Sequence, residues 1–232
     1  MKDKRLYYYI GGVLVVLLLI CLIFFFTKDK NPANTSSGTN TSGSTKNDLT
    51  PAALQKNISY TSALTKNGSL VVFVKNSNKV VVELEVEVEY YDANGLLVKS
   101  DSDSLYAVDS NNEVAIEFWL TPDSFDNYKI YVDVNATNAI SYSNKLEIVH
   151  NNTGKEITVQ VKNPTENIID NIGVSIVYYL NDQVVGIDTD SAYDIKPNRS
   201  GNFEFNYPTD RRYNNVLFDK YKVFVNEAYS NN

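Results

Sequence analysis

An internal repeat constrains the fold of this chain more than any other feature of its sequence. Val74-Lys75-Asn76 recurs 87 residues later as Val161-Lys162-Asn163, and the segment 125–132 recurs 93 residues later as 218–225. Strings that match in the same order at nearly constant spacing indicate two copies of one structural unit. The larger second spacing predicts that the second copy carries six extra residues (93 minus 87), within 209–216.

Each copy has the pattern of β-strands. Valine, leucine and tyrosine at the even positions 82–90 alternate with four glutamates at 83–89, as expected for a strand with one buried and one wet face. Asn94-Gly95 follows, a pair that favours the positive φ angles of a tight hairpin turn. The chain is therefore predicted to be all-β, with two tandem immunoglobulin-like antiparallel β-sandwiches, 57–135 and 136–232, after one N-terminal transmembrane helix.

The strands carry a resemblance to a known family. A valine-rich strand that ends in Tyr-Tyr-Asp, a proline-containing turn into Phe203-Glu204-Phe205, and a final Tyr-Lys-Val resemble the FxLYD family of bacterial extracellular repeats. The motif of that family falls on Val88, Tyr90, Tyr91 and Asp92 in the first copy and on Ile176, Tyr178, Tyr179 and Leu180 in the second, which departs from it by lacking the Asp. The resemblance implies extracellular sandwich-like modules with no assigned enzymatic activity.

An apolar run near the N-terminus predicts a membrane span. Residues 6–26 carry no charge over 21 positions, which as a helix would measure about 31 Å, close to the ~30 Å hydrocarbon core of a bilayer. Lys2, Lys4 and Arg5 precede the run, so the tail 1–5 is expected in the cytoplasm and the C-terminal domains outside the cell. The predicted location is thus the cell membrane, as a single-pass protein.

Two other interpretations of the apolar run are less consistent with its residues. A cleaved signal peptide needs small residues after the apolar core, where this chain has Phe24-Phe25-Phe26. A lipoprotein signal needs a small residue just before its Cys, but Cys21 follows Ile20. An uncleaved signal anchor is therefore expected, followed by a disordered Ser/Thr/Gly/Asn linker over 27–56, with one helical turn beginning at Thr50-Pro51.

Composition argues against most chemistry. The net charge is −7, or about −9 without the N-terminal tail, so nucleic acid is not an expected partner. Cys21 is the only Cys, so neither an internal disulfide nor a thiolate zinc site is expected. His150 is the only His and follows a predicted strand, and no Gly-rich phosphate loop occurs. We expect no enzymatic activity, no catalytic residues and no cofactor.

A repeated acidic string is the strongest candidate for a metal site. Asp101 and Asp103 recur as Asp188 and Asp190, with hydroxyl residues between and after them. Carboxylates that share a face are calcium ligands in many proteins, although the Gly and bidentate Glu of a helix–loop–helix site are missing. The alternative is an acidic edge strand that resists pairing with another sheet.

Two surface features indicate a partner for an interaction protein. The glutamates at 83–89 form either a solvated strand face or a docking surface for cations. Arg211, Arg212 and Tyr213, in the extension of the second copy, have the composition of contact hot spots; the alternative is a surface loop without a partner. The leading hypothesis is a non-enzymatic surface protein that binds an unknown protein or cell-envelope partner or acts as a spacer. The alternative is an accessory or sensor subunit that associates with a membrane complex through its transmembrane helix.

Overall fold

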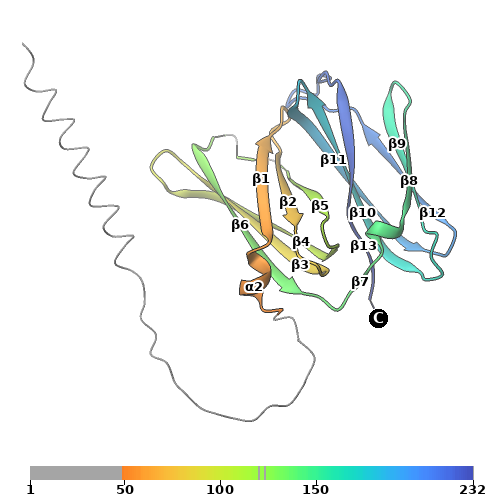
Figure 1. Cartoon of the computed structure of the whole chain (residues 1–232). Helices are drawn as coiled ribbons and strands as arrows, with labels where there is room; N and C mark the ends of the chain where they lie inside the picture. Colours follow the sequence, from red (N-terminus) through yellow and green to blue (C-terminus); the bar gives the residue numbers. More distant parts are fainter. Residues whose placement is uncertain (1–48, 120, 123, 232) are drawn as a thin grey trace, which may run out of the picture. The chain divides into compact units, whose positions relative to one another are not determined.

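The computed structural model describes residues 49–119, 121–122 and 124–231, which belong to one compact unit, Lys46–Asn232 (Figure 1). The predicted cytoplasmic tail 1–5, the transmembrane helix 6–26 and the linker as far as residue 48 lie outside the described residues. Among the helices that are described, none has the length and apolar character needed to cross a bilayer.

The described chain is built almost entirely of antiparallel strands, which confirms the all-β prediction. In chain order the elements are α2 (Pro51–Gln55), β1 (Ile58–Leu64), β2 (Leu70–Asn76), β3 (Val82–Tyr91), β4 (Leu97–Val108), β5 (Glu113–Phe118), β6 (Asn127–Ala136), β7 (Ile140–Ser141), the 3-10 helix η1 (Ser143–Lys145), β8 (Glu147–Asn152), β9 (Glu156–Lys162), β10 (Ile169–Leu180), β11 (Gln183–Ile195), β12 (Ser200–Asn206) and β13 (Lys220–Ser230).

These strands form four sheets that follow the same order twice. Sheet A is β1-β2-β5 and sheet B is β4-β3-β6; sheet D is β8-β9-β12 and sheet C is β11-β10-β13, with the short β7 added at one edge. One apolar core lies between sheets A and B, and another lies between sheets C and D. The alternation of β3 behaves as expected, because Val86 and Val88 are fully buried in the first core and Glu85 and Glu87 are exposed.

The residues of the sequence repeat have the same structural role in both halves. Asn76 is fully buried, and its side-chain amide donates to the carbonyl of Val108 at the end of β4 (3.1 Å). Asn163 is equally buried and donates to the carbonyl of Ile195 at the end of β11 (2.9 Å). In each half, the repeated Asn therefore links one sheet to the end of a strand in the facing sheet, β4 or β11. Its side-chain donors satisfy carbonyls that are buried there.

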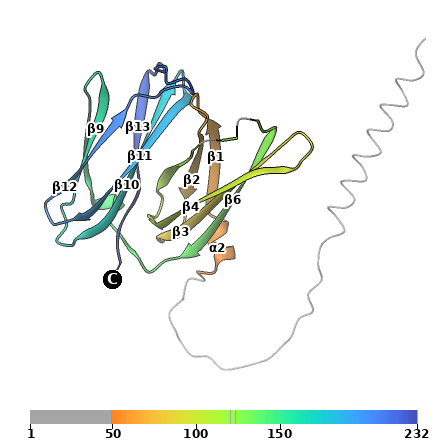
Figure 2. The same cartoon turned by 180° about the vertical axis from the view of Figure 1, so that it is seen from behind.

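A third apolar cluster lies where sheet A meets sheet C. Val71, Ala115, Val177, Ile187 and Phe224 are buried there, on the faces of the two sheets that point away from their own cores. The sheets are therefore layered in the order B, A, C, D, which Figures 1 and 2 show from opposite sides. β2 and β10 are consequently buried on both faces, a pattern that strict alternation of buried and wet residues does not predict.

The predicted helical turn that begins at Thr50-Pro51 is confirmed as α2, but two local features differ from the sequence-based expectation. α2 places Leu54 in the first core, so the folded region begins before Asn57, within the predicted linker; the Thr50 side chain forms no capping bond. In the first hairpin only Gly95 has positive φ (79°), and the loop is closed by Asp92, whose side chain accepts from the backbone N–H of Leu96 (2.8 Å). The tight two-residue turn, with both central φ angles positive, occurs instead in the second half, at 181–182.

Candidate functional site

The predicted contact loop, 209–215, is a small self-supported turn between β12 and β13. The Asp210 carboxylate accepts hydrogen bonds from the backbone N–H of Arg212 (2.8 Å) and of Asn214 (2.9 Å). The pKa of Asp210 is lowered, first by the side-chain hydrogen bond from Asn214 and then by its backbone bond. Tyr213 has a positive φ of 62° and is 88% exposed. The loop therefore holds an aromatic ring in water without burying it.

This loop and the end of β5 enclose a cup of about 260 Å³ at the junction of the two halves. It is lined by Asn67, Trp119, Thr121, Thr209, Asp210, Arg211 and Tyr213. Trp119 is 59% exposed. It is also the only Trp of the chain. Large aromatic rings in water are unfavourable for an isolated domain, and their concentration in one concave place is typical of contact sites.

Arg211 ties the cup to both halves of the molecule. Its guanidinium donates to Thr121 Oγ1 in the first half (3.0 Å) and packs over the backbone of Gly68, in the place where any other residue would carry a Cβ. Gly68 itself has φ of 89°, a conformation that few residues except glycine adopt. All three predicted contact residues are exposed to solvent, and Arg211 is in addition tied to the first half by its contacts with Thr121 and Gly68.

Sequence reasoning did not identify Trp119 as part of this site. The signal was present, because Ile116 and Phe118 are buried and a period of two then places Trp119 on the outer face of sheet A. The sequence does not show that this end of β5 lies close to the contact loop, which is about 90 residues further along the chain. That proximity depends on the packing of sheet A against sheet C.

The four aspartates proposed for calcium lie on two edge strands of different sheets. Asp101 and Asp103 are on β4, directly opposite Val88 and Val86 of β3. Asp188 and Asp190 occupy the equivalent places on β11, opposite Ile176 and Val174 of β10. Within the described ranges, no cluster of three or more His, Cys, Asp or Glu side chains is arranged to hold a metal ion. The calcium site stays a prediction, and the edge position is the one that the alternative interpretation requires.

A second hollow, of about 180 Å³, lies between the two halves and is acidic. Asp103, Glu117, Asp190 and Glu227 are among its lining residues. Burial raises the pKa of Glu117 to about 7, although a hydrogen bond from Ser69 Oγ (2.8 Å) opposes the shift. Burial also raises the pKa of Glu227, which accepts from the backbone N–H of Tyr106 (2.8 Å). These carboxylates favour the protonated form more than free ones do.

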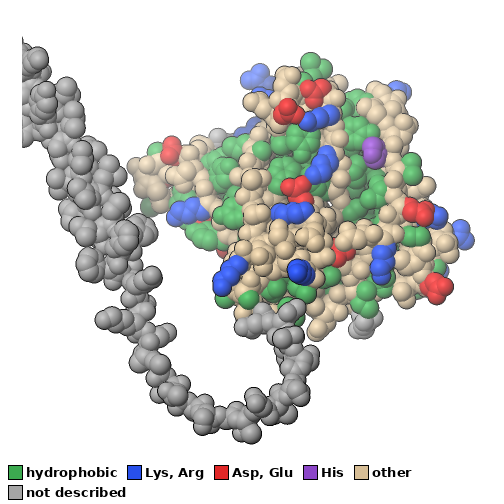
Figure 3. Space-filling view, in the orientation of Figure 1, with side chains coloured by type: hydrophobic (Ala, Val, Ile, Leu, Met, Phe, Trp, Pro, Cys, Tyr) green, Lys and Arg blue, Asp and Glu red, His purple; other side chains and the backbone are tan. Residues whose placement is uncertain are grey.

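The single histidine lies at the surface (Figure 3). His150 is on β8, and its Nδ1 is 3.0 Å from the hydroxyl of Tyr221 on β13. The two rings meet edge to face, with centroids 5.4 Å apart. We therefore interpret His150 as a packing partner of the Tyr221 ring.

Comparison with known proteins adds little to this picture. No protein-family model matches the chain, and no curated protein matches it. Among solved structures, red sea bream transglutaminase is similar at 11% identity and a TM-score of 0.25. The match covers 65% of this chain but 27% of that one, so the chain corresponds to about a quarter of the length of the transglutaminase. A likeness of this degree supports no conclusion about fold or activity.

Proposed function

We propose that this chain is a membrane-anchored surface protein without enzymatic activity, whose two immunoglobulin-like sandwiches in tandem bind a protein partner through the cup around Trp119. The observation that carries the proposal is the pairing of two largely exposed aromatic rings, Trp119 and Tyr213, beside a positioned Arg211. Trp, Tyr and Arg are the residues that contribute most to binding energy at protein interfaces.

The fixed geometry of the cup supports the same function. Arg211 and Thr121 come from different halves, and the buried cluster between sheets A and C keeps those halves together. A site whose side chains are held before binding loses less conformational freedom when the partner arrives. The uncharged run 6–26 would hold the cup near a membrane surface, where the linker 27–48 separates it from the lipid headgroups.

A pull-down with the full chain tests the proposal. The chain is solubilised from membranes in mild detergent, and the recovered cell-envelope proteins are quantified for the wild type and for Trp119→Ala/Tyr213→Ala. We expect the double variant to lose at least one partner that the wild type recovers. Tyr193→Ala removes another exposed ring, 68% exposed and outside the cup, and should retain that partner. Equal recovery by the double variant and the wild type would reject the cup as a contact site.

The anchor is tested separately. Protease added to intact cells should digest the domains 57–232 while leaving a membrane-protected N-terminal fragment. Complete protection of these domains in intact cells would show that they are inside, and a surface role would then be excluded.

A further inference from the structure

β6 is an edge strand whose outward backbone groups face a groove. It pairs with β3 on one side, along the whole of Asn127–Ala136, and with no other strand of the described sheets. The hydroxyl of Tyr60 donates to the carbonyl of Ile130 (3.1 Å), which shows that this carbonyl points away from β3. In an antiparallel pair, alternate residues direct both backbone groups to the same side, so Val132 and Val134 also direct theirs outward.

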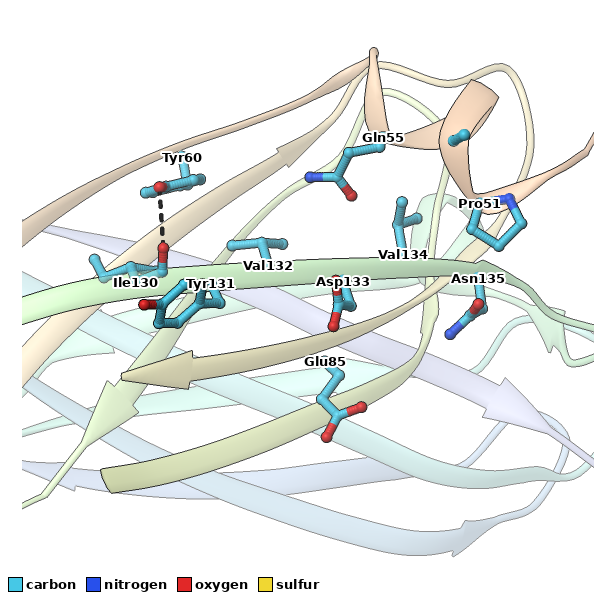
Figure 4. Close-up of a pocket in the computed structure, with 11 residues that line it drawn as sticks. Pro51, Gln55, Tyr60, Glu85, Ile130, Tyr131, Val132, Asp133, Val134 and Asn135 are labelled. Atoms are coloured by element: carbon cyan, nitrogen blue, oxygen red, sulfur yellow. Dashed lines mark hydrogen bonds between the residues drawn. The ribbon is translucent and has the colours of Figure 1, made fainter. Parts of the chain in front are cut away.

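The groove beside this edge has a volume of about 640 Å³. Its lining includes Pro51 and Gln55 of α2, Tyr60 of β1, Glu85 of β3 and the residues 130–135 of β6. Figure 4 shows Val132 and Val134 pointing toward β1, while Tyr131 and Asp133 point to the opposite side of the strand, where Glu85 lies. The open edge thus presents backbone groups to solvent along a strand whose outer side chains are polar or aromatic.

The charged residues of β6 are arranged so that two antiparallel copies of the strand would place opposite charges next to each other. Lys129 and Asp133 lie two residues before and two residues after Tyr131, and all three are on the outer face of sheet B. Within the chain, Asp133 is directly opposite Glu85 of β3, an arrangement of like charges that is unfavourable. A cation from outside would relieve it. Lys129 of another chain is such a cation if the two β6 strands run antiparallel.

We propose that β6 pairs with β6 of a second copy of this chain, about a twofold axis that passes through Tyr131. In this register Tyr131 is opposite Tyr131 of the second copy, and Lys129 is opposite Asp133 of the second copy, twice by symmetry. Ile130 and Val132 then exchange backbone hydrogen bonds with their counterparts, as the outward direction of the Ile130 carbonyl requires. In the single chain the Tyr60 hydroxyl donates to the Ile130 carbonyl, and this hydrogen bond breaks when the copies pair.

This register is specific. A shift that keeps the outward groups paired moves the strands by two residues, which places Lys129 or Asp133 opposite Tyr131 and loses both ion pairs. The groove has Glu85 and Asp133 as its charged lining residues, so a basic extended peptide is the other candidate occupant. A second copy is favoured because it supplies both the positive charge and the matching aromatic ring.

Cysteine crosslinking in membranes tests the pairing directly. Tyr131→Cys is made in the full chain with Cys21→Ser, so that the introduced thiol is the only one. In the proposed register the two substituted positions form a non-hydrogen-bonded pair, with Cα atoms about 4.5 Å apart, within the range of a disulfide. Mild oxidation should therefore give a dimer on a non-reducing gel. Tyr193→Cys, an exposed position on the edge strand β11, is the matched control and should crosslink at least tenfold less.

Charge reversal tests the register. Lys129→Glu and Asp133→Lys, each added to Tyr131→Cys, create two repulsive pairs and should lower the crosslinked fraction about tenfold, a factor that corresponds to about 1.4 kcal/mol. The combined variant restores opposite charges and should recover the dimer. If the variants melt at the same temperature as the unsubstituted protein, a folding defect does not explain the loss of crosslinking. The proposal is overturned if Tyr131→Cys crosslinks no better than the control, if it crosslinks to a different protein instead, or if the combined variant fails to recover.

Discussion

The side-chain amide of Asn226 on β13 forms both hydrogen bonds that a neighbouring strand would form with Ala115 on β5. Its Oδ1 accepts from the Ala115 N–H (3.0 Å), and its Nδ2 donates to the Ala115 carbonyl (2.9 Å). Ser175 Oγ donates to the same carbonyl (2.9 Å). Asn226 is 7% exposed and Ala115 is fully buried, so water does not compete for these groups. One side chain of the second half therefore completes the backbone bonding of the first.

Asn226→Leu is expected to destabilise the whole described fold. The substitution leaves the N–H of Ala115 buried without an acceptor, which costs about 1–3 kcal/mol, in addition to the hydrogen bonds that are lost. The measurement is the free energy of unfolding in urea. Asn202→Ala, at an exposed position on β12, is the control and should change that free energy by less than about 0.5 kcal/mol. Equal effects of the two substitutions would contradict the role assigned to Asn226.

Acidification is expected to stabilise the fold through Glu117. The pKa of Glu117 is raised from 4.5 in the free side chain to about 7 by burial, with the charge of Asp188 contributing in the same direction. A folded-state pKa above the unfolded one means that the folded protein binds the proton more tightly. The contribution of Glu117 to stability is therefore largest below about pH 4.5 and is lost as pH rises through about 7, by an amount on the order of 3 kcal/mol.

Glu117→Gln checks this linkage. The variant cannot ionise, so the decrease in unfolding free energy between about pH 5 and pH 8 should become shallower, and the variant should be more stable than the wild type at pH 8. Glu204→Gln, on an exposed face of β12, is the matched control and should keep the slope of the wild type. An unchanged slope in the Glu117 variant would show that other groups cause the pH dependence.

The repeated asparagines should be equally important in the two halves. Asn76 donates to the carbonyls of Val80, Val108 and Asp109, and Asn163 donates to those of Asn167 and Ile195. Asn76→Ala and Asn163→Ala each leave buried carbonyls without a donor, and each should cost about 2–3 kcal/mol in urea unfolding. Asn135→Ala, at an exposed position on β6, should be close to neutral. A neutral result for either buried Asn would contradict the structural interpretation of the repeat.

Gly68 should control the shape of the cup. Gly68→Ala is strained by its φ of 89° and pushes the Arg211 guanidinium away from Thr121, so a loss of about 1–2 kcal/mol in stability is expected. Because Trp119 is the only Trp, the change in its fluorescence spectrum reports on the cup directly. Gly154→Ala has a similar φ of 86° and open space around it, and should lose stability without altering the Trp spectrum.

The alternation of apolar and polar residues predicted the strands and the buried face of β3, because period two depends only on the chain itself. It did not predict the burial of Val71 and Val177, since both residues are covered by the opposite half. A tight two-residue turn was predicted at Asn94-Gly95. The structure has a wider loop there, because the Asp92 side chain accepts a hydrogen bond from the Leu96 N–H. The Arg211 loop was predicted as a contact loop from its composition, and this stays a prediction; its proximity to Trp119 depends on packing between sheets and could not be predicted.

Sheets A and C conceal Val71, Ala115, Val177, Ile187 and Phe224 from water only while they stay together. Neither half is therefore expected to be stable alone. If one half were isolated by truncation, it would expose an apolar sheet face and become prone to aggregate. A protease that cuts the connection at 137–139 should consequently leave two fragments that remain associated. The stability of each half therefore depends on the presence of the other.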